Sequence, residues 1–587
     1  MPEYLAPGVY VEETSFRAKS IEGVGTSTTA FVGPTRKGPF RVNADDHTAP
    51  EMLTSYGDFE RLYGSYADLS YGTNYLAHAA RAYFNEGGTR LYVCRVPGAG
   101  ATYASAAVNP NPAADEDVVF HARFPGAAGN GRIDITEFVT PGSDKVMQFA
   151  PQGTLLRTGP DNALVHYVKV GGDWHPANAP GDPAAKTDDL VAATPRVVTL
   201  VVTAIDDMPP GEPRDGDRVE GNVLTYEGLG LHPAHPRWIG HVLAPQPGRR
   251  SDQLQNAYSI GIGSKVSATE LHTAIFTGLK PGVHVRTILL EGGTDGTAPA
   301  NLAYQSALDL LSGVEDISIV AAPGSAAYDA QAINASLISH AEARRSYRIA
   351  VLDTPPQQTP GQVRTLRGFM DSRYAALYYP WVYVSNPLAR PGRDDIPAEV
   401  ALPPSSFVCG IYARNDVQRG VHKAPANEVV RSALRFEVDV NFGQQELLNP
   451  LGVNCLRLLS GRGYRVWGAR LVSSDPEWKY VSDRRYFNYL EASIDRGTQW
   501  AVFEPNGERL WANVRQTISD FLYNEWRNGA LLGASQEEAY FVRCDRSTMT
   551  QNDLDNGRLV CLIGVAIIRP AEFVIFRIGQ KTADSRG

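Results

Sequence analysis

Four apolar runs decide the fold of this chain: RTILL at 286–290, ISIVAA at 317–322, YRIAVLD at 347–353 and AALYYPWVYV at 375–384. Each run is short and rich in β-branched or aromatic residues, so each predicts a strand. The segments between them, at about 299–312, 327–345 and 361–371, have helical spacing. Strands that alternate with helices are typical of parallel βαβ units. We therefore expect an α/β domain, which we place at residues 256–430.

The same alternation occurs nearer the N-terminus. TAFVG at 29–33 and RLYVCRV at 90–96 predict strands, and the amphipathic segment at 73–88 predicts a helix that ends at its two glycines. We expect residues 21–100 to form the N-terminal part of the protein core.

The sequence pattern changes between residues 101 and 255. Short strand-like runs, among them RIDITEF at 132–138 and RVVTLVVTAI at 196–205, are separated by Pro, Gly, Asp and Ala. The sequence predicts an inserted all-β domain here.

A third pattern follows the Pro-rich, irregular stretch at 385–430. Helices are predicted near 483–494 and 508–528, and the second has an apolar stripe of Leu510, Val514, Ile518, Phe521 and Leu522. We expect residues 431–570 to form an α+β C-terminal domain, so the chain as a whole is predicted to be a mixed α/β and α+β multidomain protein.

Both ends of the chain have the composition of strands. The run at 569–580 contains Phe573, Val574, Ile575, Phe576 and Ile578, and PGVYVEE at 7–13 contains Val9, Tyr10, Val11 and Glu12. A hydrophobic strand needs a hydrogen-bonding partner, either in its own sheet or in a neighbouring molecule. We expect terminal arms at 1–20 and 571–587, and the sequence leaves both kinds of partner open.

Composition excludes several classes of protein. With 587 residues, 43% of them hydrophobic and 20% charged, the chain is long enough for about four globular domains and is not a disordered polymer. A net charge of −9 without a dense Lys/Arg cluster argues against nucleic-acid binding. The longest apolar run, at 559–568, is too short to cross a membrane. No signal-peptide pattern opens the sequence, so we expect synthesis in the cytoplasm.

Motifs that would bind a cofactor or a metal are incomplete. EGGTDGT at 291–297 and GIGSKV at 261–266 lack the spacing of phosphate-binding loops. NDLDNGR at 552–558 has no glutamate at the last position of a calcium loop, and HPAH at 232–235 fits a turn as well as a metal site. The five cysteines are widely spaced and form no CxxC pair. We expect no cofactor and no metal.

One aspartate invites comparison with a hydrolase. Asp353 ends a predicted strand, where a subtilisin-type aspartate would lie, but such a triad needs His and then Ser further along the chain. The only later histidine, His422, lies in GVHKAPAN, and no GTSMA-like serine segment follows it. We expect no catalytic residues, although an α/β hydrolase remains the alternative from another functional class.

The chain resembles contractile tail sheath proteins, of the kind found in myophage tails, R-type pyocins and extracellular contractile injection systems. The resemblance lies in PGVYVEE at 7–13, FVGPTRKGP at 31–39, GGTDG at 292–296, AVLDTP at 350–355, GVHKAPAN at 420–427 and most of 461–580, including SSDPEWKYV at 473–481, FLYNEWRNGALLG at 521–533 and FVRCDRSTMTQNDLDNGR at 541–558. It covers both termini and most of residues 260–580, but not the insertion at 101–255.

The resemblance implies a mechanical function. Sheath subunits polymerise around an inner tube in an extended, metastable state and contract to drive the tube through a target envelope. It implies a subtilisin-like α/β domain without a triad, a C-terminal domain that faces the tube, and arms that complete a small sheet in neighbouring subunits. The implied partners are further copies of the chain, the inner tube, and baseplate and terminal cap proteins, in a particle assembled in the bacterial cytoplasm. A baseplate or cap subunit of the same machine is the nearest alternative.

Overall fold

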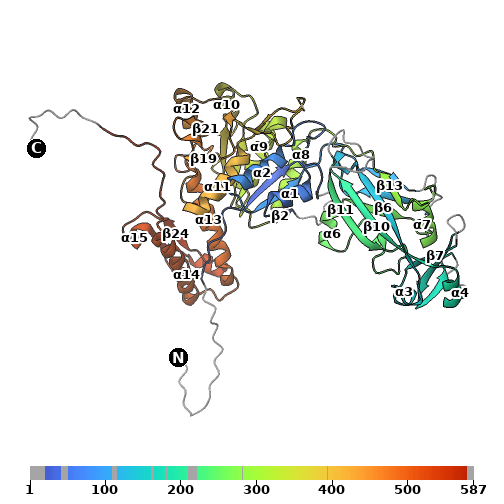
Figure 1. The fold of residues 1–587 in the computed structure, drawn as a ribbon. Helices are drawn as coiled ribbons and strands as arrows, with labels where there is room; N and C mark the ends of the chain where they lie inside the picture. Colours follow the sequence, from blue (N-terminus) through green and yellow to red (C-terminus); the bar gives the residue numbers. More distant parts are fainter. Residues whose placement is uncertain are drawn as a thin grey trace, which may run out of the picture.

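The computed structural model describes residues 20–40, 50–108, 115–159, 164–178, 183–208, 221–280, 282–392 and 394–577. A central α/β part lies between the insertion, which contains β6, β10 and β13, and the C-terminal part, which contains α14, α15 and β24 (Figure 1). The prediction of a mixed α/β, multidomain protein is confirmed. Among the described residues, no helix is both long and apolar enough to cross a membrane.

The central part is built on a nine-stranded sheet in the order β19-β22-β21-β16-β15-β14-β1-β3-β2. The six strands from β21 to β3 run parallel, and β2, β22 and β19 are antiparallel additions at the two edges. The bounds, in chain order, are β1 (Thr29–Gly33), β2 (Glu51–Leu53), β3 (Leu91–Arg95), β14 (Ile319–Ala321), β15 (Ile349–Asp353), β16 (Ala375–Tyr379), β19 (Glu428–Val429), β21 (Val453–Leu459) and β22 (Gly463–Val466).

Helices cover both faces of this sheet, and the side chains of each strand alternate between two apolar cores. In β14, for example, Ile319 and Ala321 pack in one cluster with α1, α2 and α11, while Val320 packs in the other with α8, α9 and α10. Because both faces are buried, the strands are continuously apolar, as the sequence showed. The helices are α1 (Tyr56–Tyr63), α2 (Tyr75–Glu86), α8 (Asn301–Leu311), α9 (Ala326–Glu342), α10 (Pro360–Arg367) and α11 (Ser405–Arg419).

The insertion is larger than the sequence predicted. Its two sheets have the orders β13-β6-β10-β7-β8-β9, with β11 also on β10, and β12-β5-β4. β12 (Tyr258–Ile262) and β13 (Val285–Leu289) pair antiparallel with β5 (Val118–Ala122) and β6 (Arg132–Pro141). The boundary at 255 was therefore too early, and RTILL is not a parallel strand of the central sheet.

The insertion is also not purely β. Its described residues include five short helices, of which α7 (Ala268–Phe276) packs against the same apolar core as β12 and β13. The remaining elements are β4 (Ser105–Ala107), β7 (Leu155–Thr158), β8 (Val165–Val170), β9 (Asp173–Pro176), β10 (Arg196–Asp206), β11 (Asn222–Leu229), α3 (Asp144–Phe149), α4 (Thr187–Ala192), α5 (Ile239–Val242) and α6 (Arg250–Gln255).

One further strand assignment and one domain boundary need correction. The run AALYYPWVYV forms two strands on either side of Pro380, because β17 (Val382–Ser385) leaves the central sheet and joins β18 (Glu399–Leu402) and β20 (Arg435–Phe436). β21 and β22 extend the central sheet well past the boundary placed at 430.

The C-terminal part packs two long helices, α13 (Val481–Gly497) and α14 (Glu508–Arg527), against a hairpin of β23 (Tyr540–Arg543) and β24 (Leu562–Val565). The five residues of the predicted stripe on α14 are all buried in this core. Shorter helices accompany the central and C-terminal parts: α12 (Phe442–Leu448), α15 (Gln536–Ala539) and α16 (Gln551–Asp555).

Candidate subunit-contact site

The C-terminal segment continues directly from the β23–β24 hairpin. The Ala566 amide donates to the Ala539 carbonyl, and the Ala566 carbonyl accepts from the Leu532 amide, each at 2.8 Å. Beyond this point the segment crosses from the C-terminal part to the edge of the central part and then leaves the body (Figure 1). The predicted arm is thus attached to the protein before residue 573.

Glu572 makes the strongest of these attachments. Its carboxylate accepts from Arg470 Nε at 2.7 Å and Nη2 at 2.6 Å, from Asn449 Nδ2 at 2.8 Å and from the Tyr480 hydroxyl at 2.9 Å, with Lys479 Nζ 3.4 Å away. Partial burial alone would raise the pKa of Glu572, but the hydrogen bonds from these donors and the charge of Arg470 lower it to about 2. The carboxylate therefore stays ionised at any physiological pH.

A second ion pair lies three residues earlier. Arg569 Nε is 3.5 Å from Asp483 Oδ2, at the start of α13. Burial raises the pKa of Asp483 to about 6, and the Arg569 charge acts in the opposite direction. The two ion pairs hold the segment on either side of Pro570.

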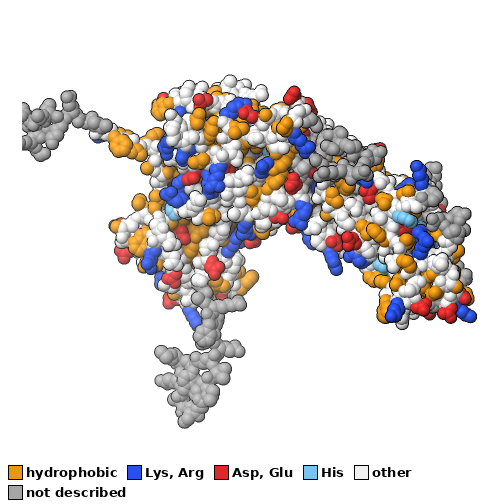
Figure 2. All heavy atoms as spheres, in the orientation of Figure 1, with side chains coloured by type: hydrophobic (Ala, Val, Ile, Leu, Met, Phe, Trp, Pro, Cys, Tyr) orange, Lys and Arg blue, Asp and Glu red, His pale blue; other side chains and the backbone are white. Residues whose placement is uncertain are grey.

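The residues just beyond the anchor are apolar and exposed. Phe573, Val574, Ile575 and Phe576 expose 70%, 67%, 78% and 83% of their surface and have no strand partner among the described residues. Hydrophobic side chains gather where this segment leaves the body (Figure 2). Four consecutive exposed apolar residues mark a contact surface. The predicted Ile578, and Val9, Tyr10, Val11 and Glu12 of the N-terminal arm, lie outside the described residues.

A groove of about 1160 Å³ runs beside the base of the arm. Its walls come from the loop after α11, from α12 and from the end of β22, with Lys423, Phe442 and Trp467 among the lining residues. Phe573 and Val574 line its other side.

The β23–β24 hairpin is the smallest sheet in the described part of the chain. It has two strands, and Phe541, Leu562 and Ile563 on it expose 50%, 51% and 37% of their surface. A two-stranded sheet of this kind is only marginally stable without further strands or packing. Its edges can accept an extended strand by main-chain pairing.

Asp353 lies at the carboxyl end of β15, as predicted, but its surroundings are closed. Both hydrogen bonds that its carboxylate accepts come from Ser405, from the amide at 2.8 Å and the hydroxyl at 2.5 Å. Asp353 and Ser405 are buried, and the Trp381 indole donates to the neighbouring Thr354 carbonyl at 2.7 Å. Burial raises the pKa of Asp353 to about 7. No histidine is among the described partners of the carboxylate, so it caps the start of α11.

Sequence reasoning missed Ser405 because it looked for a protease-like serine segment. The signal was present in PPSSFVCG, where a serine follows two prolines and opens an apolar helix. His422, the other residue considered, lies elsewhere, with its ring centroid 6.3 Å from that of Tyr486.

The remaining motifs have structural roles. In HPAH, the Nδ1 atoms of His232 and His235 accept from the amides two residues later, as turn-forming side chains do. In NDLDNGR, Asp553 completes a capping box with Thr550 at the start of α16. The described ranges contain no group of three or more His, Cys, Asp or Glu residues placed to hold a metal ion.

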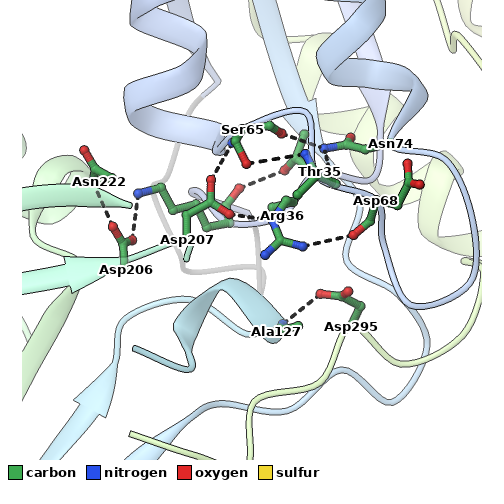
Figure 3. A network of polar contacts seen from close by, with 12 residues as sticks. Thr35, Arg36, Ser65, Asp68, Asn74, Ala127, Asp206, Asp207, Asn222 and Asp295 are labelled. Atoms are coloured by element: carbon green, nitrogen blue, oxygen red, sulfur yellow. Dashed lines mark hydrogen bonds and ion pairs between the residues drawn. The ribbon is translucent and has the colours of Figure 1, made fainter. Parts of the chain in front are cut away.

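The insertion is joined to the central part by two adjacent buried ion pairs (Figure 3). Arg36 Nε is 2.5 Å from Asp207 Oδ1, and Lys37 Nζ is 2.6 Å from Asp206 Oδ2. All four side chains are less than 10% exposed. The Ser65 amide also donates to Asp207 Oδ2 at 2.5 Å, so the end of β10 is fixed to the loops after β1 and α1.

The glycine-rich motif at 291–297 belongs to the same joint. Asp295 accepts from the Ala127 amide of the insertion at 2.8 Å and from the Ser70 amide of the central part at 2.9 Å. The two connecting segments pair with each other through antiparallel bridges that include Thr102 with Thr294. The motif therefore holds two parts of the protein together.

Comparison with known proteins identifies the family. The model of the phage tail sheath protein central domain matches residues 297–470, and that of the phage tail sheath C-terminal domain matches 473–581. A putative prophage major tail sheath protein of Pseudomonas aeruginosa (strain UCBPP-PA14) is 25% identical over 266 residues, which cover 44% of this chain and 64% of that relative. The tail sheath protein of Enterobacteria phage T4 is 23% identical over 177 residues, which cover 30% of this chain and 26% of that protein. The matched part thus spans less than two thirds of either relative.

Solved structures show the same fold over almost the whole chain. The helical sheath of the anti-feeding prophage in its contracted state has a TM-score of 0.53 and 21% identity, covering 98% of this chain and 100% of that one. The PVC sheath complex of an extracellular contractile injection system, also contracted, has a TM-score of 0.52 and 19% identity, covering 99% of both chains.

These matches define the class as phage-tail-type structural proteins. Residues 297–470 and 473–581 match the central and C-terminal domains of phage tail sheath proteins, and the resemblance found in the sequence is confirmed.

Proposed function

We propose that this protein is the structural subunit of a contractile sheath, which polymerises around an inner tube in an extended state and contracts to drive the tube through a target envelope. The single observation that carries the proposal, beside the tail sheath matches, is the apolar segment from Phe573 to Phe576, which is four consecutive residues long and exposed. Energy for contraction comes from a difference in contacts between two packings of the subunits.

The arms act by strand exchange. The segment from Phe573 through Ile578 of one copy adds a strand to the β23–β24 hairpin of a neighbour, and the N-terminal residues Val9 to Glu12 add another. Exposed Phe541 and Leu562 on the hairpin give the incoming apolar side chains a surface to cover. Main-chain hydrogen bonds provide the affinity in such an arrangement, and side-chain contacts fix the register.

The other partners follow from the same role. The C-terminal part faces the inner tube, and baseplate and terminal cap proteins bind the two ends of the polymer. The subunit is made in the bacterial cytoplasm and needs no cofactor. The central domain is a subtilisin-like α/β fold that carries no triad, because the carboxylate of Asp353 is used as a helix cap. A baseplate or cap subunit would have less use for an arm at each end.

Negative-stain electron microscopy of the purified full-length protein, alone and with its inner tube protein, tests the proposal. We expect tubes or stacked rings of regular width. A protein that stays monomeric at high concentration with the tube protein present contradicts the proposal, and isolated closed rings that never stack favour the baseplate or cap subunit.

A further inference from the structure

The base of the arm is attached to a different part of the protein from the one it emerges from. The segment leaves β24 in the C-terminal part, but Glu572 binds Arg470 and Asn449 of the central part. Arg470 is only 8% exposed, and its amide donates to the Asn454 side chain at 2.6 Å. Asn454 is completely buried on β21. The anchor is thus connected through two side chains to the central sheet.

The anchor coincides with a sharp change in exposure. Glu572 is held by four donors, whereas the next residue, Phe573, exposes 70% of its surface. The free arm therefore begins at residue 573.

We propose that Glu572 is a positioning residue that fixes where the arm leaves the central sheet and so sets the length of the link between neighbouring subunits. This inference rests on the proposed function, in which the arm is exchanged. Without the anchor, the next attachment back along the chain is the ion pair of Arg569 with Asp483, so residues 570–572 join the free arm. These three residues add about 10 Å of slack.

In the proposed function the arm keeps neighbouring subunits connected while they slide past one another, so the length of the link matters. A link anchored on β21 transmits tension from the neighbour directly to the central sheet. A link held only by Asp483 of α13 and by the β23–β24 hairpin transmits it to the C-terminal part instead. Glu572 decides between these two routes.

A distance measurement between spin labels tests the anchor in the full-length protein. Labels are placed at Ala571→Cys, beside Glu572, and at Glu446→Cys, an exposed position on α12, in a Cys561→Ser background because the other four cysteines are buried. We expect a narrow distribution of label distances when Glu572 is native. The distribution should be at least threefold broader in Glu572→Ala and intermediate in width in Glu572→Gln. Glu537→Ala, which removes an exposed carboxylate on α15, is the matched control and leaves it narrow. A distance distribution that is as narrow in Glu572→Ala as in the labelled protein with native Glu572 overturns the inference.

A second measurement connects the anchor to assembly. Glu572→Ala and Glu572→Gln, both checked for an unchanged melting curve, are compared with the native sequence for the length and regularity of tubes in negative stain. We expect Glu572→Ala to lose most of its long, regular tubes, and the exchanged pair Arg470→Glu with Glu572→Arg to recover part of them. If Glu572→Ala broadens the label-distance distribution but leaves the length and regularity of the tubes unchanged, the positioning role is overturned. If the native sequence forms no tubes, the proposed function fails, and the label result then reports on the anchor alone.

Discussion

Asp353 and Glu572 are carboxylates held by hydrogen bonds, yet their pKa values move in opposite directions. Burial dominates at Asp353, where Ser405 is a neutral donor, and raises its pKa to about 7. At Glu572 the same burial effect is outweighed by Arg470 and the other donors, and the pKa falls to about 2. A buried carboxyl without a cation costs stability when ionised, whereas a carboxylate with a cation gains from ionisation.

The pH dependence of stability should reveal Asp353. Because its folded pKa is raised above the unfolded value, its contribution is fully present below about pH 4 and is lost as the pH rises through about 7. Asp353→Asn keeps an acceptor for the Ser405 amide but cannot ionise. We expect the variant to gain stability relative to the native sequence as the pH rises from 4 to 7, at a rate of about 1.4 kcal/mol per pH unit. Urea unfolding at several pH values measures this, with the exposed Asp309→Asn as control. A constant difference between variant and native protein contradicts the expectation.

The closed surroundings of Asp353 also predict an absence of chemistry. We expect no hydrolysis of peptides, esters or nucleotides, and we expect Asp353→Ala to change only stability or assembly. Chromogenic ester and peptide substrates measure this. Turnover above background that disappears in the variant would restore the hydrolase interpretation.

At the scale of single elements, the joint between the insertion and the central part is the most sensitive place. Removing one partner of a buried ion pair leaves an unpaired charge and typically costs about 3–5 kcal/mol, whereas removing both costs much less. We therefore expect Asp207→Ala to destabilise the protein strongly and Arg36→Met with Asp207→Ala to restore part of the loss. Thermal or urea unfolding of the set measures the coupling, with exposed Asp189→Ala as control. If the single and double variants lose the same free energy of unfolding, the Arg36–Asp207 pair does not stabilise the joint.

We expect the arm to become a strand only when it pairs with a neighbouring subunit. Removing residues 573–587 keeps the Glu572 anchor but deletes the apolar side chains, each worth about 1.5–3 kcal/mol when fully buried in a neighbour. We expect a soluble, folded monomer that forms no tubes, and the same result from Val574→Asp with Phe576→Asp, which places charges in a buried sheet. Size-exclusion chromatography and electron microscopy measure both, and removal of 581–587 is the control.

Two outcomes argue against strand exchange. If the protein shortened at residue 572 unfolds as a monomer, the arm belongs to its own subunit. If it still builds tubes of normal length, the arm is dispensable.

Local pattern predicted most elements but not their partners. The stripe on α14 follows from helical periodicity, and the strands β1, β3, β14 and β15 follow from short, continuously apolar runs, because burial on both faces leaves such a run. The prediction that RTILL is a parallel strand of the central sheet was wrong, because a short apolar run looks alike in a parallel and an antiparallel sheet. Glu572 and Asp207 could not be recognised, since their partners lie 102 and 171 residues away in the sequence. Such contacts exist only once the fold is formed.

At the scale of the whole molecule, the central sheet is assembled from distant pieces. β1 pairs with β14, so Thr29 lies beside Ile319, and the insertion lies in the sequence between them. The two connections are adjacent in space, because Thr102 and Thr294 are bridged. An insertion whose ends meet in this way adds little loop entropy to the core.

The true limits of the insertion can be tested by excision. Replacing residues 103–292 with a short Gly/Ser linker removes every strand of its two sheets, and it leaves Arg36 and Lys37 facing water. We expect a soluble core with one cooperative melt.

Replacing 101–255, the limits that composition suggested, leaves β12, α7 and β13 without β5 and β6, so that Ile260 and Ile288, 2% and 7% exposed in the intact protein, lose their cover. We expect that protein to aggregate, as measured by light scattering and calorimetry. If the protein lacking 101–255 melts as cooperatively as the protein lacking 103–292, β12 and β13 do not depend on the rest of the insertion. If the protein lacking 103–292 aggregates, the ion pairs of Figure 3 contribute to the stability of the core itself.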